Sequence, residues 1–281
     1  MDAIFTWKRL SSYKELESTF FWHYAKISTQ TAGKFHNTIL YTDEEGRKDF
    51  ERFGIGFNKV IVLPELESFK GSIFSIPKIY AMIQRKEPYV HLDFDVFTNI
   101  THTSNEPIAF GYPEVNLKVF TDINEIEYLN QNYLNSYKEE FYKYYDRKDW
   151  DWRLVPNFGV FIVNNPSLVS DIFKDILNNI EELKPNESKE HKYASFIEQF
   201  LFMRAVEDYD IDYEFIYDAN PFTFKDQNFV YVKDKLVNVS YTSGLYKHLN
   251  TLKFTHFHGY KKYPVFSNTI IKKLITKENP I

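Results

Sequence analysis

The chain of 281 residues contains no cysteine. This excludes disulfide bonds, thiolate metal sites and cysteine nucleophiles, and it fits a reducing compartment. No apolar run approaches the roughly 20 residues of a membrane-spanning helix, and the opening MDAIFTWKRL lacks the apolar core of a signal peptide. No stretch rich in glycine, proline or serine separates two parts of the chain. We therefore predict one domain over residues 1–281, located in the cytoplasm, with peripheral contact at the inner face of the membrane left open.

Charge and composition narrow the classes of partner. The formal net charge is −5, which argues against nucleic-acid binding, although lysines make the C-terminal end locally basic. Hydrophobic residues make up 43% of the chain, enough for a sizeable core. The aromatic share of 19% could fill that core or form stacking platforms for sugars, and composition does not separate the two.

The pattern along the chain predicts an α/β fold. Short apolar runs such as NTILYT and KVIVLP alternate with segments of helical spacing. This alternation indicates a mostly parallel sheet flanked by helices on both faces. Residues from about 114 to 152 interrupt it with a charged, aromatic-rich segment of helical spacing. We expect a helical insertion there, either a solvated helical pair or a surface that binds an acceptor or partner.

The segment YVHLDFDVFTNI, residues 89–100, places two carboxylates in what reads as a buried strand. In an extended strand, His91, Asp93 and Asp95 would share one face, so the two carboxylates would converge. Two unpaired anions in a low-dielectric setting are costly, and a hard divalent cation would remove that cost. The alternative is a pair of solvated aspartates that cap the next loop.

A second informative segment is HFHGYKKYP, residues 256–264. Gly259 allows the backbone to approach a ligand closely, and two lysines follow it. An imidazole from His256 or His258, added to two carboxylates, makes an oxygen and nitrogen set suited to Mn²⁺ or Mg²⁺. Lysines beside such an ion suit a diphosphate, because cation and ammonium groups would share its charge.

In chain order, the motifs are a helix with a lysine, DFD, NFGVF, a helix with Glu-Gln, and HFHGYKK. Together they resemble the retaining glycosyltransferases of the glycogenin and bacterial lipopolysaccharide galactosyltransferase type, which have the GT-A fold, a Rossmann-like sheet. The resemblance extends from about residue 3 to 264. This sequence departs from the family where Tyr263 and Pro264 replace Pro-Trp and where Glu198 replaces an aspartate.

The resemblance implies roles for individual residues. It assigns the metal, Mn²⁺ or Mg²⁺, to Asp93, Asp95 and His256. It implies that Thr6 contacts the base, that Lys262 contacts a phosphate, that Lys78 lies where a basic residue approaches the donor, and that Asp93 binds the donor through the metal. The catalytic residues that it implies are Asn157, which lines the sugar pocket with Gly159, and Glu198 and Gln199, which stand near the reacting carbon. In the helix expected over residues 192–207, the last two lie near or beyond the edge of the apolar stripe.

The function expected from this resemblance is metal-dependent transfer of a hexose, with retention, from a nucleotide-sugar. The donor is expected to be UDP-linked and the acceptor a glycan, a lipid-linked saccharide or another hydroxyl. One alternative is a non-catalytic or degenerate GT-A domain that binds glycans. Another is a phosphatase of the haloacid-dehalogenase type, since LDFDVF also resembles that nucleophile motif, but Phe97 stands where that family carries Thr or Val. A nucleotidyltransferase would need a Gly- and Arg-rich N-terminal loop, which MDAIFTWKRLSS is not.

Overall fold

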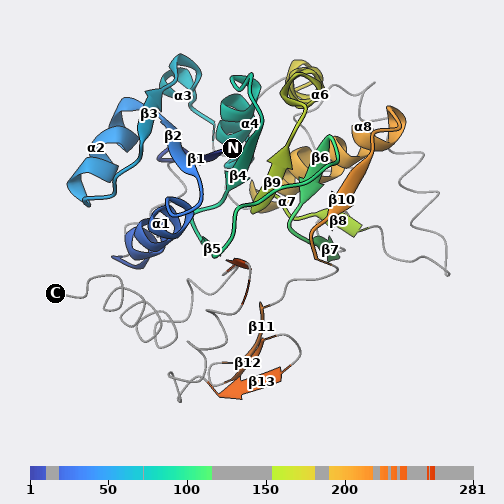
Figure 1. Cartoon of the computed structure of the whole chain (residues 1–281). Coiled ribbons are helices and arrows are strands. Elements are labelled where there is room, and N and C mark those ends of the chain that lie inside the picture. Colours follow the sequence, from blue (N-terminus) through green and yellow to red (C-terminus); the bar gives the residue numbers. More distant parts are fainter. Residues whose placement is uncertain are drawn as a thin grey trace.

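A seven-stranded mixed sheet forms the centre of the molecule, in the order β10-β6-β9-β4-β1-β2-β3 (Figure 1). The computed structural model describes residues 1–10, 19–71, 73–115, 154–180, 190–217, 222–226, 229–232, 235–238, 252 and 254–256. Among the strands of this sheet, β9 alone runs against its neighbours. The strands are β1 (Asp2–Trp7), β2 (Asn37–Thr42), β3 (Lys59–Val62), β4 (Tyr89–Leu92), β6 (Ile108–Phe110), β9 (Val160–Val163) and β10 (Tyr213–Phe215).

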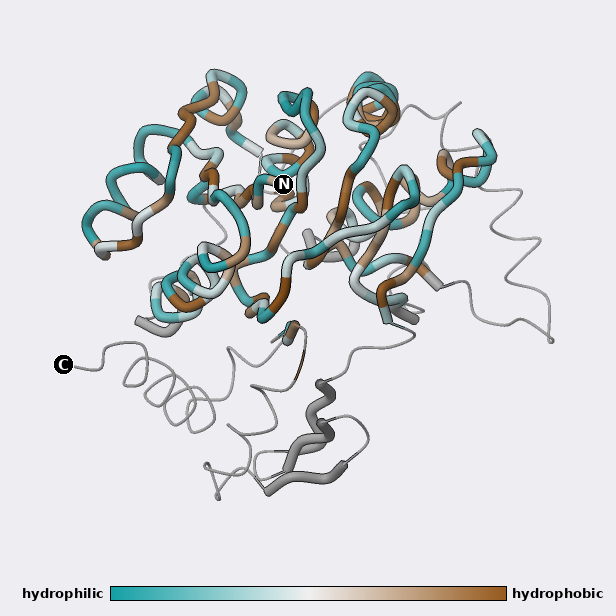
Figure 2. The backbone as a smooth tube through the Cα atoms, in the orientation of Figure 1, coloured by the Kyte–Doolittle hydropathy of each residue, from teal (hydrophilic) through white to brown (hydrophobic). Residues whose placement is uncertain are grey.

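Helices cover both faces of this sheet, and each face has its own core. The helices α1 (Thr19–Ala32) and α2 (Glu44–Arg52) contribute to one core, and α3 (Pro64–Ser68), α4 (Ser75–Ile83), α6 (Pro166–Asn178) and α8 (Phe202–Asp208) to the other. Strand β9 shows the alternation, since Val160 belongs to the first core and Phe161 to the second. Figure 2 shows hydrophobic colour along the central strands and hydrophilic colour over much of α2. The predicted α/β fold class, a mostly parallel sheet flanked by helices, is confirmed.

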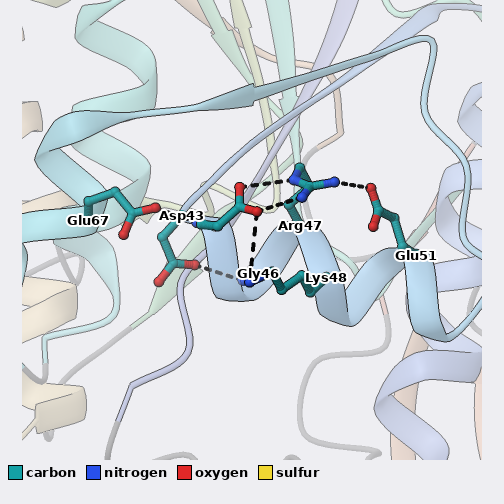
Figure 3. A network of polar contacts seen from close by, with 7 residues as sticks. Asp43, Gly46, Arg47, Lys48, Glu51 and Glu67 are labelled. Carbon is teal, nitrogen blue, oxygen red and sulfur yellow. Dashed lines mark hydrogen bonds and ion pairs between the residues drawn. The ribbon is translucent and has the colours of Figure 1, made fainter.

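Helix α2 is fixed at its N-terminus by side-chain hydrogen bonds (Figure 3). The Asp43 carboxylate caps it by accepting from the backbone N–H of Gly46 at 2.9 Å, and it also pairs with Lys8 just beyond β1. Glu67 accepts from the backbone N–H of Glu44 at 2.6 Å. The Lys8–Asp43 pair ties the carboxyl ends of β1 and β2 to each other, and the Glu67 contact ties α3 to α2.

Three smaller sheets complete the described part of the chain. Strand β5 (Val96–Thr98) pairs with β14 (Phe254–His256), β7 (Pro113–Val115) pairs with β8 (Leu154–Pro156), and β11 (Phe222–Asp226), β12 (Phe229–Val232) and β13 (Lys235–Asn238) form the third. The predicted helical insertion begins with the end of β7, and the rest of it lies outside the described residues. No helix of the described part combines the length and the apolar character needed to cross a bilayer.

Two buried histidines join the N-terminus to the segment that follows β5. His36 and His102 stack with ring centroids 5.7 Å apart. Nδ1 of His36 lies 3.2 Å from the carbonyl oxygen of Met1, and Nε2 of His36 accepts a hydrogen bond from the backbone N–H of His102. Burial lowers the pKa of both imidazoles, that of His102 to about 3, with His36 as a second cause for His102. Both rings are therefore neutral at neutral pH.

This pair predicts a loss of stability in acid. Because the pKa of His102 is lower in the folded chain, the unfolded chain binds the proton first as the pH falls below about 6.5. Between about pH 7.5 and pH 5, this group alone should lower the free energy of unfolding by roughly 2 kcal/mol. Urea denaturation at a series of pH values should show that the free energy of unfolding falls more steeply with falling pH in the wild type than in His102→Gln. Parallel pH profiles would contradict it.

Candidate functional site

The two aspartates lie in a turn at the carboxyl end of β4. The strand ends at Leu92, and the backbone N–H of Val96 donates to the carbonyl of Asp93 at 3.0 Å, which closes the turn. From α1, the Ser28 hydroxyl donates to the carbonyl of Val96 at 2.6 Å. The prediction of one strand over residues 89–100 was therefore wrong beyond Leu92, because the chain turns there and resumes as β5. The turn, rather than strand alternation, brings the carboxylates together.

His256 reaches this turn through pairing of β14 with β5. In that antiparallel pair His256 lies opposite Val96, next in sequence to Asp95. Its Nε2 is 3.2 Å from Oδ1 of Asp95, and both side chains are buried. One ligand atom from each of Asp93, Asp95 and His256 lies within 4.8 Å of the others. Two hard carboxylates and one imidazole could hold a divalent cation such as Mn²⁺ or Mg²⁺.

Lys78 of α4 joins this group to a third carboxylate. Its Nζ is 2.7 Å from Oδ1 of Asp93 and 3.4 Å from Oε1 of Glu198. Burial acts to raise the pKa of the Asp93 carboxyl, but the ammonium group of Lys78 holds that pKa below its ordinary value. Burial and the charge of Lys78 lower the pKa of His91 to about 4. Asp93 is therefore an anion and His91 a neutral ring at neutral pH.

Glu198 and Gln199 lie in a π-helical turn. The helical run consists of α7 (Glu190–Ser195), the π-helical turn η3 (Phe196–Leu201) and α8. The helix expected over residues 192–207 is therefore present. Glu198 and Gln199, expected near or beyond the edge of its apolar stripe, are themselves buried, at only 4% and 7% exposed. The sequence pattern assumed an ordinary α-helix, and a π turn inserts an extra residue and is frequent at functional sites.

Asn157 and Gly159 form the wall behind the imidazole. The backbone N–H of Gly159 donates to Oδ1 of Asn157 at 2.8 Å, and its carbonyl accepts from the backbone of Asp93 at 2.9 Å. A Cβ atom on residue 159 would lie 2.7 Å from Cε1 of His256 and 2.7 Å from Oδ1 of Asn157. Glycine is required here for close approach of the histidine ring to the backbone.

Replacing Gly159 by alanine should therefore displace His256. We expect the affinity for Mn²⁺ to fall at least about 10-fold and the fold to lose roughly 1–3 kcal/mol from overpacking. Isothermal titration with MnCl₂ and urea denaturation measure the two effects. Gly56→Ala is the matched control, because nothing lies within 4 Å of a Cβ at that position. Unchanged Mn²⁺ affinity in Gly159→Ala would contradict the metal-ligand role of His256.

The remaining predicted residues are less closely connected to this group. Thr6 lies at the carboxyl end of β1, and its hydroxyl is buried with no hydrogen-bond partner among the described residues. Lys262 and His258 lie outside the described residues.

Sequence reasoning missed Tyr112, whose hydroxyl is 2.9 Å from Nδ1 of His256. The available signal was its place after the apolar run Ile108–Phe110, since strand ends of such a sheet collect ligand-binding groups.

No curated protein matches the chain. Mouse xyloside xylosyltransferase 1, apo form, has a similar structure with a TM-score of 0.45 and 10% identity, over 94% of this chain and 99% of that one. The glycosyltransferase GlyE of Streptococcus pneumoniae TIGR4 has a TM-score of 0.41 and 10% identity, over 99% of this chain and 64% of that one. The PaToxG glycosyltransferase has a TM-score of 0.39 and 14% identity, over 74% of this chain and 69% of that one. A family model matches residues 11–280, and the chain therefore belongs to the family of unknown function DUF6734.

Proposed function

We propose that the chain is a glycosyltransferase that moves a hexose from a nucleotide-sugar, UDP-hexose, to a hydroxyl of a glycan or lipid-linked saccharide. The reaction requires a divalent cation, Mn²⁺ or Mg²⁺, held by Asp93, Asp95 and His256. The observation that carries the proposal is the convergence of these three ligands beside the ammonium group of Lys78. Two carboxylates, an imidazole and a lysine at one sheet edge suit a metal-bound diphosphate. The order of the sequence motifs supports the same class.

Bond cleavage in this reaction leaves negative charge on the departing nucleoside diphosphate. When bound, the cation would supply positive charge to that leaving group. Lys78 and Lys262 bind the phosphate oxygens, and Thr6 contacts the base. Glu198 acts through Lys78, since its carboxylate lies 3.4 Å from the ammonium group and holds it toward the phosphates.

Retention of configuration follows from a front-face route. Gln199 and Asn157 steady the electron-poor sugar while the acceptor hydroxyl enters on the face from which the diphosphate departs and gives its proton to that diphosphate. Gly159 lines the sugar side of this site, where its lack of a Cβ lets the ring of His256 lie against the backbone. The ion pair between Glu198 and Lys78 supports this route, because a carboxylate engaged by an ammonium group is a weaker nucleophile.

A donor panel tests the proposal. The wild-type protein is screened for thermal stabilisation by UDP-, GDP- and CMP-linked sugars, each with MnCl₂ and with EDTA, and hits are assayed for nucleotide release. We expect a UDP-hexose to stabilise the protein and to release UDP, with both effects lost in EDTA. Stabilisation without turnover for any acceptor would favour a glycan-binding domain. Metal-dependent hydrolysis of p-nitrophenyl phosphate would favour the phosphatase alternative.

A further inference from the structure

Tyr112 is fixed in place by three separate contacts. It follows β6 and is buried. Its backbone carbonyl accepts from the backbone N–H of Asn157 at 3.0 Å. Its ring lies nearly parallel to that of Phe254, with an interplanar angle of 11°. Its hydroxyl reaches Nδ1 of His256 at 2.9 Å. These contacts therefore hold the phenol of Tyr112 in a fixed position against the imidazole of His256.

The imidazole of His256 has two nitrogens in different surroundings. Nε2 faces Asp95 at 3.2 Å, and Nδ1 faces the hydroxyl of Tyr112. The backbone of Gly159 closes off the ring at Cε1 and Nδ1. Nε2 is thus the nitrogen directed at the carboxylates. A cation shared with Asp93 and Asp95 must be bound through Nε2, and a neutral ring then carries its proton on Nδ1.

We propose that Tyr112 is a positioning residue that selects the metal-binding tautomer of His256, an inference that rests on the metal site of the proposed function. In the metal-bound state, Nδ1–H donates to the phenolic oxygen of Tyr112, and the lone pair of Nε2 is left for the cation. In the metal-free state the direction reverses, so that Nε2–H donates to Asp95 and the hydroxyl of Tyr112 donates to Nδ1. One proton leaves Nε2 and one is taken up at Nδ1, so the ring stays neutral.

A hydroxyl is suited to this role because it can both donate and accept. A phenylalanine ring would fill the same space but remove the hydroxyl to which Nδ1–H donates. That loss falls mainly on the metal-bound state, because a bound cation polarises the imidazole and strengthens the hydrogen bond of its other nitrogen. Outer-shell partners of this kind are worth about 10- to 100-fold in metal affinity. No motif in the sequence marks such a partner.

The experiment compares Tyr112→Phe with Tyr89→Phe by isothermal titration of the nucleotide-free protein with MnCl₂. Tyr89 is also buried, at the start of β4, and its hydroxyl has no hydrogen-bond partner in the part of the chain that the structure describes. We expect Tyr112→Phe to bind Mn²⁺ about 10- to 100-fold more weakly and Tyr89→Phe to bind like the wild type. Denaturation curves of the metal-free proteins show whether either variant has lost its fold. If Tyr112→Phe does not fold, the tautomer measurement on the wild type decides the matter.

The tautomer is read from imidazole ¹⁵N spectra of the wild type with and without Mg²⁺, which is diamagnetic; the His256 signals are those absent from His256→Gln. We expect the proton on Nε2 without metal and on Nδ1 with it. A wild type that binds neither ion overturns the metal site and the proposed function with it. A wild type that binds Mn²⁺, with Tyr112→Phe binding equally well or Nε2 protonated in the Mg²⁺ state, overturns only the role of Tyr112.

Discussion

Replacement of Asp95 by asparagine is expected to lower kcat/KM for sugar transfer at least about 100-fold while the fold survives, since each ~1.4 kcal/mol of barrier is a factor of ten. Asparagine keeps the shape of the side chain and its contact distance to His256, now 3.2 Å from the carboxylate. It removes one negative charge from the group that would hold the cation. The loss should therefore appear in Mn²⁺ affinity and in turnover, and not in the free energy of unfolding.

Initial rates of UDP release, titration with MnCl₂ and urea denaturation measure these three quantities. Asp2→Asn is the matched control, because Asp2 is a carboxylate on β1 that pairs with Arg85 at 2.8 Å, at the opposite end of the strand from the site. We expect full activity in that variant. Undiminished turnover of Asp95→Asn, or full wild-type activity in EDTA, would remove the metal hypothesis.

The sequence was sufficient to predict the sheet, because the sheet depends on patterns local to each segment. The three side chains that the fold brings together, Asp93, Asp95 and His256, were singled out by the resemblance to a known family. Alternation such as that of Val160 and Phe161 is fixed by the two-residue period of a strand. The geometry of the site was not predictable in the same way. The turn at Asp93 depends on Ser28 and on the pairing of β5 with β14, which joins segments far apart in the chain.

The burial of Glu198 shows a second limit. Helical periodicity places a residue correctly only if every turn has the same number of residues, and the π turn η3 changes that number. Glu198, expected with Gln199 near or beyond the edge of the apolar stripe, is buried and meets Lys78 of α4. Tyr112 shows a third limit, since a tyrosine that hydrogen-bonds to His256 looks in sequence like any other aromatic residue near a strand end.

Removal of the Lys78 charge, by Lys78→Met, is expected to destabilise the fold by roughly 3 kcal/mol, near the lower limit for breaking a buried pair because Asp93 keeps some solvent contact. Methionine fills a similar volume but leaves two carboxylates, Asp93 and Glu198, without the ammonium group between them. The double variant Lys78→Met/Glu198→Gln should recover about half of that loss. Lys174→Met is the control, since its pair with Asp171 is exposed and should be worth less than about 1 kcal/mol.

Ligand binding by Lys78→Met separates a role at the site from general loss of structure. Without the ammonium group, the Asp93 and Asp95 pair is more negative, so the variant should bind Mn²⁺ alone more tightly than the wild type. The diphosphate loses a cationic partner, so UDP in the presence of Mn²⁺ should bind about 10-fold more weakly, the effect of losing one charge-assisted contact. A partly unfolded protein would bind both ligands more weakly. If the affinities for Mn²⁺ and for UDP change in the same direction, Lys78 has only a structural role in the core. If they change in opposite directions, its charge acts on the donor side of the metal site.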